Sequence, residues 1–238
     1  MNARTGAAVA KPATISAWPA TLSPPAHLAY CIQRGGVTFL DVRRDRYFGL
    51  PADLEAVFEA LVQAGFRVEA LTPGLEQLIA LGVLVLGEGD KRPQTLAATP
   101  SESWLDAQIV PVGDAGPLDV ARAARSVLTA KHMLGRLSLE SIIARLRARR
   151  PGLAVMDEAM RPLALSFAKA RRWTPVEPVC LLDSLAMLDA FHRRGHHPHL
   201  VFGVIRQPFA AHCWLQIDGV VINDRLDHVA EYTPILVV

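Results

Sequence analysis

The sequence has little of what several large classes of protein need. Its 238 residues include three cysteines, which are widely spaced and odd in number. Such cysteines are poor material for a disulfide framework, lack the paired spacing of a structural zinc site, and fit a reducing cytosol best. The formal charge of +2 is close to balance and argues against a generic binder of polyanions such as nucleic acid.

Long apolar segments are also missing. The first 20 residues carry Arg4 and Lys11 but no continuous hydrophobic run of the kind that a signal peptide needs. No apolar run elsewhere reaches the length that a membrane-spanning helix requires. We therefore expect a soluble, cytoplasmic protein with no membrane partner. The chain does have 51% hydrophobic residues, enough to bury a core in one large or two small domains.

The first half of the chain predicts a short arm followed by a small domain. Residues 1–25 are rich in Ala, Pro, Thr and Ser and predict a loosely held arm. Three strand-like segments and then two helices with apolar faces follow within residues 26–88. The expected strands cover 29–32, 37–42 and 46–50, and the expected helices cover 51–64 and 74–81. This order indicates a small winged-helix-like domain.

The second half predicts helices first and an antiparallel sheet afterwards. Residues 89–102 are expected to form a linker, because Gly, Pro, Asp and Lys are frequent there, and a second domain then covers 103–238. Expected helices cover 118–133, 138–148, 157–170 and 178–194, and expected strands cover 199–205, 211–217 and 220–223. Helices followed by an antiparallel sheet are typical of an α+β domain.

Three residues of the second half have the chemistry of a cysteine protease, which needs a thiolate, a base and a group that orients the base. Cys180 lies near the start of an expected helix, with Pro178 at a first helical position. The free N–H groups and the positive end of the helix dipole favour a thiolate there and could stabilise an oxyanion. His212 lies on a following strand, and Asp224 is the expected orienting group.

The turn between two strands decides whether Asp224 can reach His212. Strand alternation puts His212 and Trp214 on one face and Cys213 on the other, so Cys213 is expected to point away into the core. A two-residue turn at 218–219 would place Asp224 opposite Cys213, on the wrong face. We therefore predict a bulged connection, or a strand that ends before Asp224.

Order, spacing and flanking residues together resemble a known family. His212 follows Cys180 by 32 residues within Ala-His-Cys-Trp-Leu-Gln-Ile-Asp-Gly, and Asn-Asp follows that histidine, ending at position 224. With Cys180-Leu-Leu-Asp-Ser-Leu-Ala-Met-Leu and Pro-Phe-Ala-Ala-His212, this pattern resembles the lasso-peptide B protein from about Arg172 to the C-terminus. The resemblance implies a transglutaminase-like (papain-like) cysteine protease. In it Cys180 is the nucleophile, His212 the base and Asp224 the orienting group, with Trp214 packed beside the site.

The same resemblance implies that the first half recognises the leader of a precursor peptide. In that family the leader adds as a strand to the third strand and lies against the last helix. Carried onto this chain, the leader-binding residues are Arg46, Tyr47, Phe48 and Gly49 on the strand and Leu75, Leu78 and Ile79 on the helix. The implied activity is cleavage of the leader–core bond of a ribosomally made lasso-peptide precursor. The implied partners are that precursor and, functionally, an asparagine-synthetase-like cyclase, and no cofactor or metal is expected.

Two other functions stay open on the sequence. A transglutaminase-like acyl transferase acting on an amine acceptor would use the same three residues, and a non-catalytic precursor-binding protein would leave them idle. A metal site is also considered, because four histidines lie close together in the chain. They are His192, His196, His197 and His199. Gly195 and Pro198 interrupt this run, so a solvated turn is the favoured interpretation.

Overall fold

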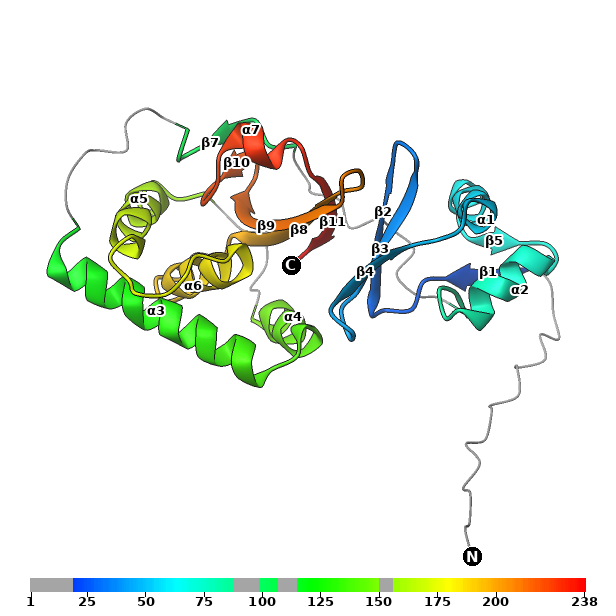
Figure 1. The fold of residues 1–238 in the computed structure, drawn as a ribbon, viewed down its shortest axis with the longest axis horizontal. Helices are drawn as coiled ribbons and strands as arrows, with labels where there is room; N and C mark the ends of the chain where they lie inside the picture. Colours follow the sequence, from blue (N-terminus) through cyan, green and yellow to red (C-terminus); the bar gives the residue numbers. More distant parts are fainter. Residues whose placement is uncertain (1–18, 88–98, 107–114, 150–155) are drawn as a thin grey trace, which may run out of the picture.

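A computed structural model of the chain describes residues 19–87, 99–106, 115–149 and 156–238. Within these residues the fold is a mixed α+β arrangement of seven helices and three small sheets. Figure 1 shows an N-terminal part, built from residues 19–87, beside a C-terminal part built from the described residues after it. No helix of the described ranges is both long and apolar enough to cross a bilayer.

A three-stranded antiparallel sheet forms the middle of the N-terminal part. Its order is β2–β3–β4, with β2 at Leu28–Gln33, β3 at Gly36–Asp41 and β4 at Arg46–Gly49. These strands agree with the three predicted ones to within one residue at each end. The short turn between β2 and β3 depends on Gly35, whose φ of 98° is a left-handed conformation that glycine adopts without strain. β4 lies at the edge of the sheet, with a strand partner on one side.

Two helices and three very short strands complete the N-terminal part. The helices are α1 (Ala52–Gln63) and α2 (Pro73–Ala80), close to the predicted ranges. The strands are β1 (Ala20–Ser23), β5 (Arg67–Val68) and β6 (Val85–Leu86), which pair in the order β5–β1–β6. The prediction of a loose arm is therefore wrong for residues 20–23, because pairing on both sides buries Leu22 completely. Residues 1–18 of that arm lie outside the described residues.

The sheet β2–β3–β4 is buried on both of its faces. One face carries Tyr30 and Phe39, whose rings meet the ring of Phe58 from α1 edge to face at 5.1 and 5.0 Å. The opposite face carries Cys31 and Leu40, which belong to the hydrophobic cluster of the C-terminal part. Each strand therefore supplies alternate side chains to two different cores.

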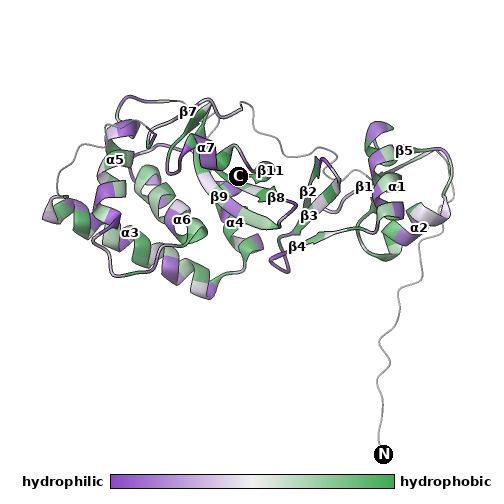
Figure 2. Cartoon of the chain, turned by 45° about the horizontal axis from the view of Figure 1, so that its top comes forward, coloured by the Kyte–Doolittle hydropathy of each residue, from purple (hydrophilic) through white to green (hydrophobic). Residues whose placement is uncertain are grey.

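The C-terminal part places a helical layer against a five-stranded sheet. The helices are α3 (Pro117–Arg136), α4 (Leu139–Ala148), α5 (Met160–Arg171) and α6 (Cys180–His192). The sheet has the order β11–β8–β9–β10–β7, with β8 at His199–Ile205, β9 at Ala210–Ile217, β10 at Val220–Val221, β11 at Thr233–Val237 and β7 at Glu102–Ser103. α6 packs against α3, α5 and β9, and in Figure 2 it is mostly hydrophobic.

Three elements of the C-terminal part are absent from the sequence prediction. They are β7, β11 and the short helix α7 at Leu226–Val229. β7 falls in the last residues of the predicted linker and pairs in parallel with β10, so 102–103 form a strand of the sheet. The rest of that linker, up to residue 98, lies outside the described residues.

The two parts are docked against each other by polar as well as apolar contacts. β11 packs against β2 and β3. The side chain of Gln33 donates from Nε2 to the carbonyl of Val204 at 2.8 Å, and Arg206 forms an ion pair with Glu55 at 2.8 Å. Gly36 lies directly beneath this ion pair, because a Cβ there would come within 2.3 Å of both side chains. A side chain at position 36, where β3 begins, would therefore collide with the ion pair that joins the two parts.

Candidate active site

Cys180 is the first residue of α6. The residue before it, Val179, is the N-cap, so the helix begins two residues later than the predicted start at Pro178. The first N–H with a helical partner is that of Asp183, which donates to the carbonyl of Val179. The preceding backbone N–H groups, next to the thiol, have no partner within the helix and form the positive end of the helix dipole. Cys180 itself is partly buried.

His212 lies on β9, on the face of the sheet opposite to α6. Its ring stacks on Trp214 at 6.2 Å, and Trp214 is fully buried. Directly opposite His212 on β8 is Gly203, where a Cβ would lie 2.7 Å from the Trp214 ring. Glycine at position 203 therefore leaves space for the Trp214 ring, on which the His212 ring stacks. The Nε2 atom of His212 and Oδ2 of Asp224 form a short hydrogen bond, which leaves Nδ1 for Cys180.

Asp224 reaches His212 because the strand ends before it. The turn at 218–219 has two residues, and β10 pairs with β9 in the simple register Val220 to Ile217. This is the register that would send Asp224 to the wrong face. β10 ends at Val221, and the side chain of Asn223 accepts the next backbone N–H of β9 at 2.7 Å in place of the strand. Of the two predicted solutions, the structure adopts the early strand end and contains no bulge in this turn.

The thiol and the imidazole carry the charges of an ion pair. Hydrogen bonds from Cys213 and His212 lower the pKa of Cys180 to about 4. Burial lowers the pKa of His212, but hydrogen bonds with Asp224 and Cys180 outweigh it and raise this pKa to about 9. Between these values Cys180 is a thiolate and His212 an imidazolium. A nucleophile and a proton donor are therefore both present at neutral pH.

Cys213 is a residue of the site that the sequence analysis missed. As expected it faces away from His212 and is buried, but the face it occupies is the one that α6 covers, and its free thiol interacts with that of Cys180 by a hydrogen bond. This bond and burial raise the pKa of Cys213 well above its usual value, so it stays a neutral donor. The expectation that Cys213 faces away from His212 into the core is therefore confirmed, but its interaction with Cys180 was not foreseen. Strand alternation separates it from its neighbour but cannot show where the start of α6 will lie.

His228 is a second residue that the sequence did not indicate. Its Nδ1 lies 3.1 Å from both carboxylate oxygens of Asp224, and its ring centre is 4.7 Å from that of His212. Tyr232 packs against both histidines at 5.3 and 5.4 Å. Burial opposes ionisation of Asp224, but hydrogen bonds from His212, the Arg225 N–H and His228 lower its pKa. The carboxylate thus serves two histidines.

A metal ion is compatible with one cluster in the described residues. Suitable ligand atoms of His212, Asp224 and His228 all lie within 4.8 Å of one another. The hydrogen bonds from both histidines to the carboxylate already account for this spacing. The four histidines between 192 and 199 do not form such a group in the described residues.

The predicted leader-binding side chains lie mostly in the core of the N-terminal part. Leu75 and Leu78 point inward from α2 and are 6% and 0% exposed, so they cannot receive a peptide as predicted. The apolar stripe of a short amphipathic helix is used up by the core beneath it. Ile79 is partly buried at the edge of this core, and Phe48 stacks on Phe39 at 5.1 Å.

The edge strand β4 differs from α2, because part of it is exposed. Arg46 and Gly49, at the two ends of β4, are exposed. Tyr47 faces the C-terminal part, where it packs against the cluster that also contains Cys180. β4 therefore offers an edge of backbone groups and one aromatic side chain turned toward the C-terminal part.

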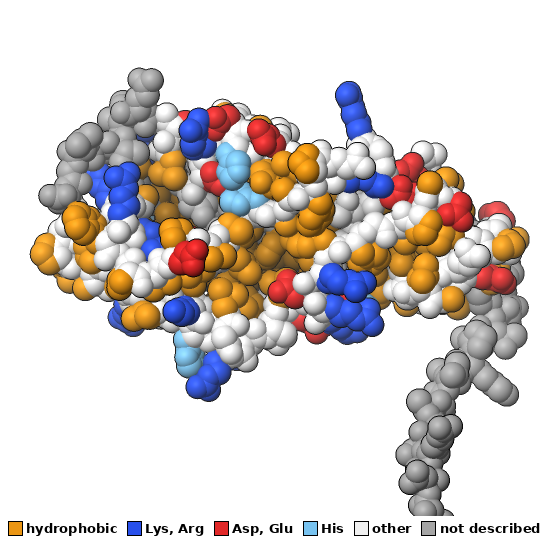
Figure 3. Space-filling model, in the orientation of Figure 1, with side chains coloured by type: hydrophobic (Ala, Val, Ile, Leu, Met, Phe, Trp, Pro, Cys, Tyr) orange, Lys and Arg blue, Asp and Glu red, His pale blue; other side chains and the backbone are white. Residues whose placement is uncertain are grey.

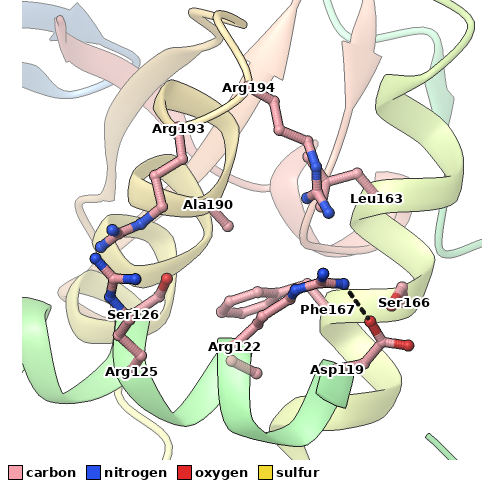
Figure 4. Close-up of a pocket in the computed structure, with 11 residues that line it drawn as sticks. Asp119, Arg122, Arg125, Ser126, Leu163, Ser166, Phe167, Ala190, Arg193 and Arg194 are labelled. Atoms are coloured by element: carbon pink, nitrogen blue, oxygen red, sulfur yellow. Dashed lines mark hydrogen bonds and ion pairs between the residues drawn. The ribbon is translucent and has the colours of Figure 1, made fainter. Parts of the chain in front are cut away.

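One hollow in the helical layer is separate from these residues. It has a volume of about 300 Å³ and lies between α3, α5 and the C-terminal end of α6, the end opposite to Cys180. Figure 4 shows its lining, which includes the side chains of Arg122, Arg125, Arg193 and Arg194. None of the predicted site residues lines it.

Comparison with known protein families finds a match within the C-terminal part. Residues 124–237 match the model of the transglutaminase-like superfamily. Over this range, just under half of the chain, the sequence is similar to that superfamily. Members of that superfamily are typically cysteine-dependent enzymes. The matched range contains Cys180, His212 and Asp224.

A curated protein is similar over a shorter stretch. The microcin J25-processing protein McjB of Escherichia coli is 44% identical over 45 residues, which make up 19% of this chain and 22% of that protein. The similarity therefore spans about a fifth of the relative's length. No solved structure matches the chain.

Proposed function

We propose that this protein is a cytoplasmic leader peptidase of lasso-peptide maturation. It binds the leader of a ribosomally made precursor and hydrolyses the leader–core bond with Cys180, His212 and Asp224. The observation that carries the proposal is the pairing of Cys180, at the start of α6, with His212, which lowers the pKa of the thiol and raises that of the imidazole, together with the hydrogen bond between His212 and Asp224. The name of the similar Escherichia coli protein, which refers to processing of microcin J25, supports this choice of substrate.

The geometry suits acyl transfer through a thioester. The Cys180 thiolate attacks the carbonyl at the leader–core junction, and the unpaired N–H groups at the start of α6 stabilise the oxyanion. His212 donates its proton to the departing amine, which leaves as the new N-terminus of the core. Water, deprotonated by the now neutral His212, then releases the leader from the enzyme. The free core amine would be the substrate of a separate asparagine-synthetase-like cyclase.

Leader recognition is proposed at β4, through backbone pairing. A peptide strand added to the edge Arg46–Gly49 would use the backbone groups on its outer side. Of the helix residues predicted for recognition, Ile79 remains in the proposal, and the buried Leu75 and Leu78 do not. Affinity would then come mainly from main-chain hydrogen bonds, which explains why few exposed side chains mark this surface.

The test is incubation of the full chain with a synthetic leader–core peptide, followed by mass spectrometry. We expect cleavage at one bond by the wild type and none by Cys180→Ala. Cys31→Ala is the matched control and should retain activity, because Cys31 is a buried thiol on the sheet β2–β3–β4. Leader binding, measured by fluorescence anisotropy, should be equal in all three proteins. Cleavage by Cys180→Ala would refute the mechanism, and a product linked to an added amine would indicate the acyl transferase instead.

A further inference from the structure

The two neighbouring aromatic residues of β4 serve different parts of the molecule. Phe48 lies against Phe39 in the core of the N-terminal part. Tyr47 points the other way and packs against the cluster of the C-terminal part, which includes Cys180. Its ring centre is 5.6 Å from that of Phe209, on the β8–β9 loop. A side chain of the recognition strand thus reaches the same region as the nucleophile.

Tyr47 is close enough to the thiols for their charges to act on it. Burial raises the pKa of Tyr47, and the charges of Cys213, Asp45 and Cys180 raise it further. The phenol therefore keeps its proton and serves as a neutral hydrogen-bond donor rather than as a base.

Apolar side chains close in the sequence to Cys180 and His212 are exposed. Phe209 is 56% exposed, and Val179, the residue directly before Cys180, is 52% exposed. Figure 3 shows hydrophobic side chains gathered in a hollow between a group of histidines on the C-terminal part and the N-terminal part. Exposed apolar groups that border a reactive thiol are typical of a substrate-binding surface.

The chemistry decides which part of a peptide would lie there. The acyl group that Cys180 takes up comes from the leader side of the scissile bond. A leader that pairs with β4 must therefore pass from the edge of that strand to Cys180 just before the cleavage point. Tyr47 lies on this route, since it projects from β4 toward the hydrophobic cluster against which Cys180 also packs.

We propose that Tyr47, together with Phe209, forms the wall that holds the leader residues immediately before the scissile bond. This proposal rests on the proposed peptidase function. The recognition strand and the nucleophile then share one continuous cleft, and Tyr47 is a specificity-determining residue. The cleft takes uncharged leader residues at these positions, because a carboxylate there would face the Cys180 thiolate and Asp224 across an apolar surface.

The first measurement is the kinetics of precursor cleavage by Tyr47→Ala, Tyr47→Phe and Phe209→Ala. We expect kcat/KM to fall about 30-fold for Tyr47→Ala and about fivefold for Phe209→Ala, as misplacement of a scissile bond does. Affinity for the isolated leader should change less than twofold, because backbone pairing with β4 is retained. A Glu placed directly before the cleavage point should lower kcat/KM about 100-fold in the wild type. Leu128→Ala is the control, since Leu128 is an equally exposed apolar residue on α3.

A second measurement tests the wall without a peptide. Cys180 is alkylated with iodoacetamide, which is small, and with N-phenylmaleimide, which is bulky, in the wild type and in Tyr47→Ala. We expect the bulky-to-small rate ratio to rise about tenfold in Tyr47→Ala and to stay constant in Leu128→Ala. Circular dichroism melting of each variant verifies that it is folded.

These measurements separate failure of the wall from failure of the peptidase. If the wild type cleaves the precursor but kcat/KM and the rate ratio of Tyr47→Ala stay within twofold of it, the wall is refuted and the peptidase stands. If the wild type cleaves nothing and the rate ratio still rises, Tyr47 does border the nucleophile and the proposed substrate is wrong. If cleavage and the rate ratio are both unaffected by every variant, the cleft lies elsewhere.

Discussion

The two parts of the molecule present their candidate sites in different ways. In the C-terminal part the candidate site consists of three side chains that lie together. Cys180 comes from the start of a helix, His212 from a strand and Asp224 from the segment after the end of a strand. In the N-terminal part the side chains proposed for binding are largely core, as Leu78 shows, and the surface that remains is the edge of β4. A site made of side chains leaves a pattern of residue types in the sequence, whereas a site made of backbone does not.

The junction adds to this comparison. Alternate residues of the sheet β2–β3–β4 belong to two cores, so β4 cannot move independently of the C-terminal part without exposing residues such as Cys31 and Leu40. The difference between the two parts is therefore one of surface chemistry, not of separate folding. The predictions below test each side of this difference in turn.

The largest effect is expected from the orienting carboxylate. Asp224→Asn should lower kcat about 10³-fold, because His212 loses the group that holds its ring and stabilises its charge. Leader affinity should not change, since β4 is untouched. Asp227→Asn, an exposed carboxylate three residues away, is the control and should keep full activity. A loss of leader binding in Asp224→Asn would show that the two surfaces are not separable.

The two faces of the N-terminal sheet offer the next largest effect. Phe39→Ala should destabilise the protein by about 3–5 kcal/mol and Leu40→Ala by about 2–5 kcal/mol, because each leaves a cavity in a packed core. Since the two residues serve different cores in one docked structure, urea unfolding followed by circular dichroism should show a single transition for both. Two transitions in Leu40→Ala, with the catalytic part unfolding alone, would contradict the shared sheet.

The pH dependence of alkylation and of peptide cleavage should distinguish the nucleophile, Cys180, from the proton donor, His212. The pKa of Cys180 is lowered to about 4, so the thiolate is present above that pH, and alkylation should rise through pH 4 and then stay level. The pKa of His212 is raised to about 9, so its proton is available below that pH and lost above it. Peptide cleavage should therefore fall above pH 9 while alkylation does not. Parallel loss of both rates above pH 9 would contradict the assignment of His212 as the acid.

A smaller effect is expected from the buried thiol donor. Cys213→Ala should shift the acid limb of Cys180 alkylation to higher pH, because the hydrogen bond that contributes most to the low pKa is lost. The rate at about pH 5 should fall severalfold, whereas the rate at about pH 8 should hardly change. An unchanged acid limb would mean that His212 alone sets the pKa.

The smallest effect is expected from the second histidine. His228→Gln should lower kcat about threefold, within the 0.5–1.5 kcal/mol that one hydrogen bond to Asp224 contributes. KM and leader affinity should stay constant. A loss as large as that of Asp224→Asn would make His228 an essential member of the site.

Much of the local structure could be predicted from the sequence. The strands 46–50 and 199–205 and the helices 51–64 and 138–148 were recognisable because their apolar periodicity records which face is buried. The set of Cys180, His212 and Asp224 could be proposed from residue type, order and spacing. The need to keep Asp224 on the His212 face predicted either a bulge or an early strand end, and the structure adopts the second.

Only the tertiary structure decided what lies next to what. The start of α6 comes to rest over Cys213, the end of the chain brings His228 to Asp224, and docking packs Tyr47 against the core of the C-terminal part. The short strands β7 and β11 and the inward turn of Leu78 also depend on partners distant in the chain. Periodicity reports that a residue is buried but not against which element, because packing between distant segments is set by the shape and area of whole faces. The sequence thus determined the elements and the reactive residues, and the packing determined their neighbours.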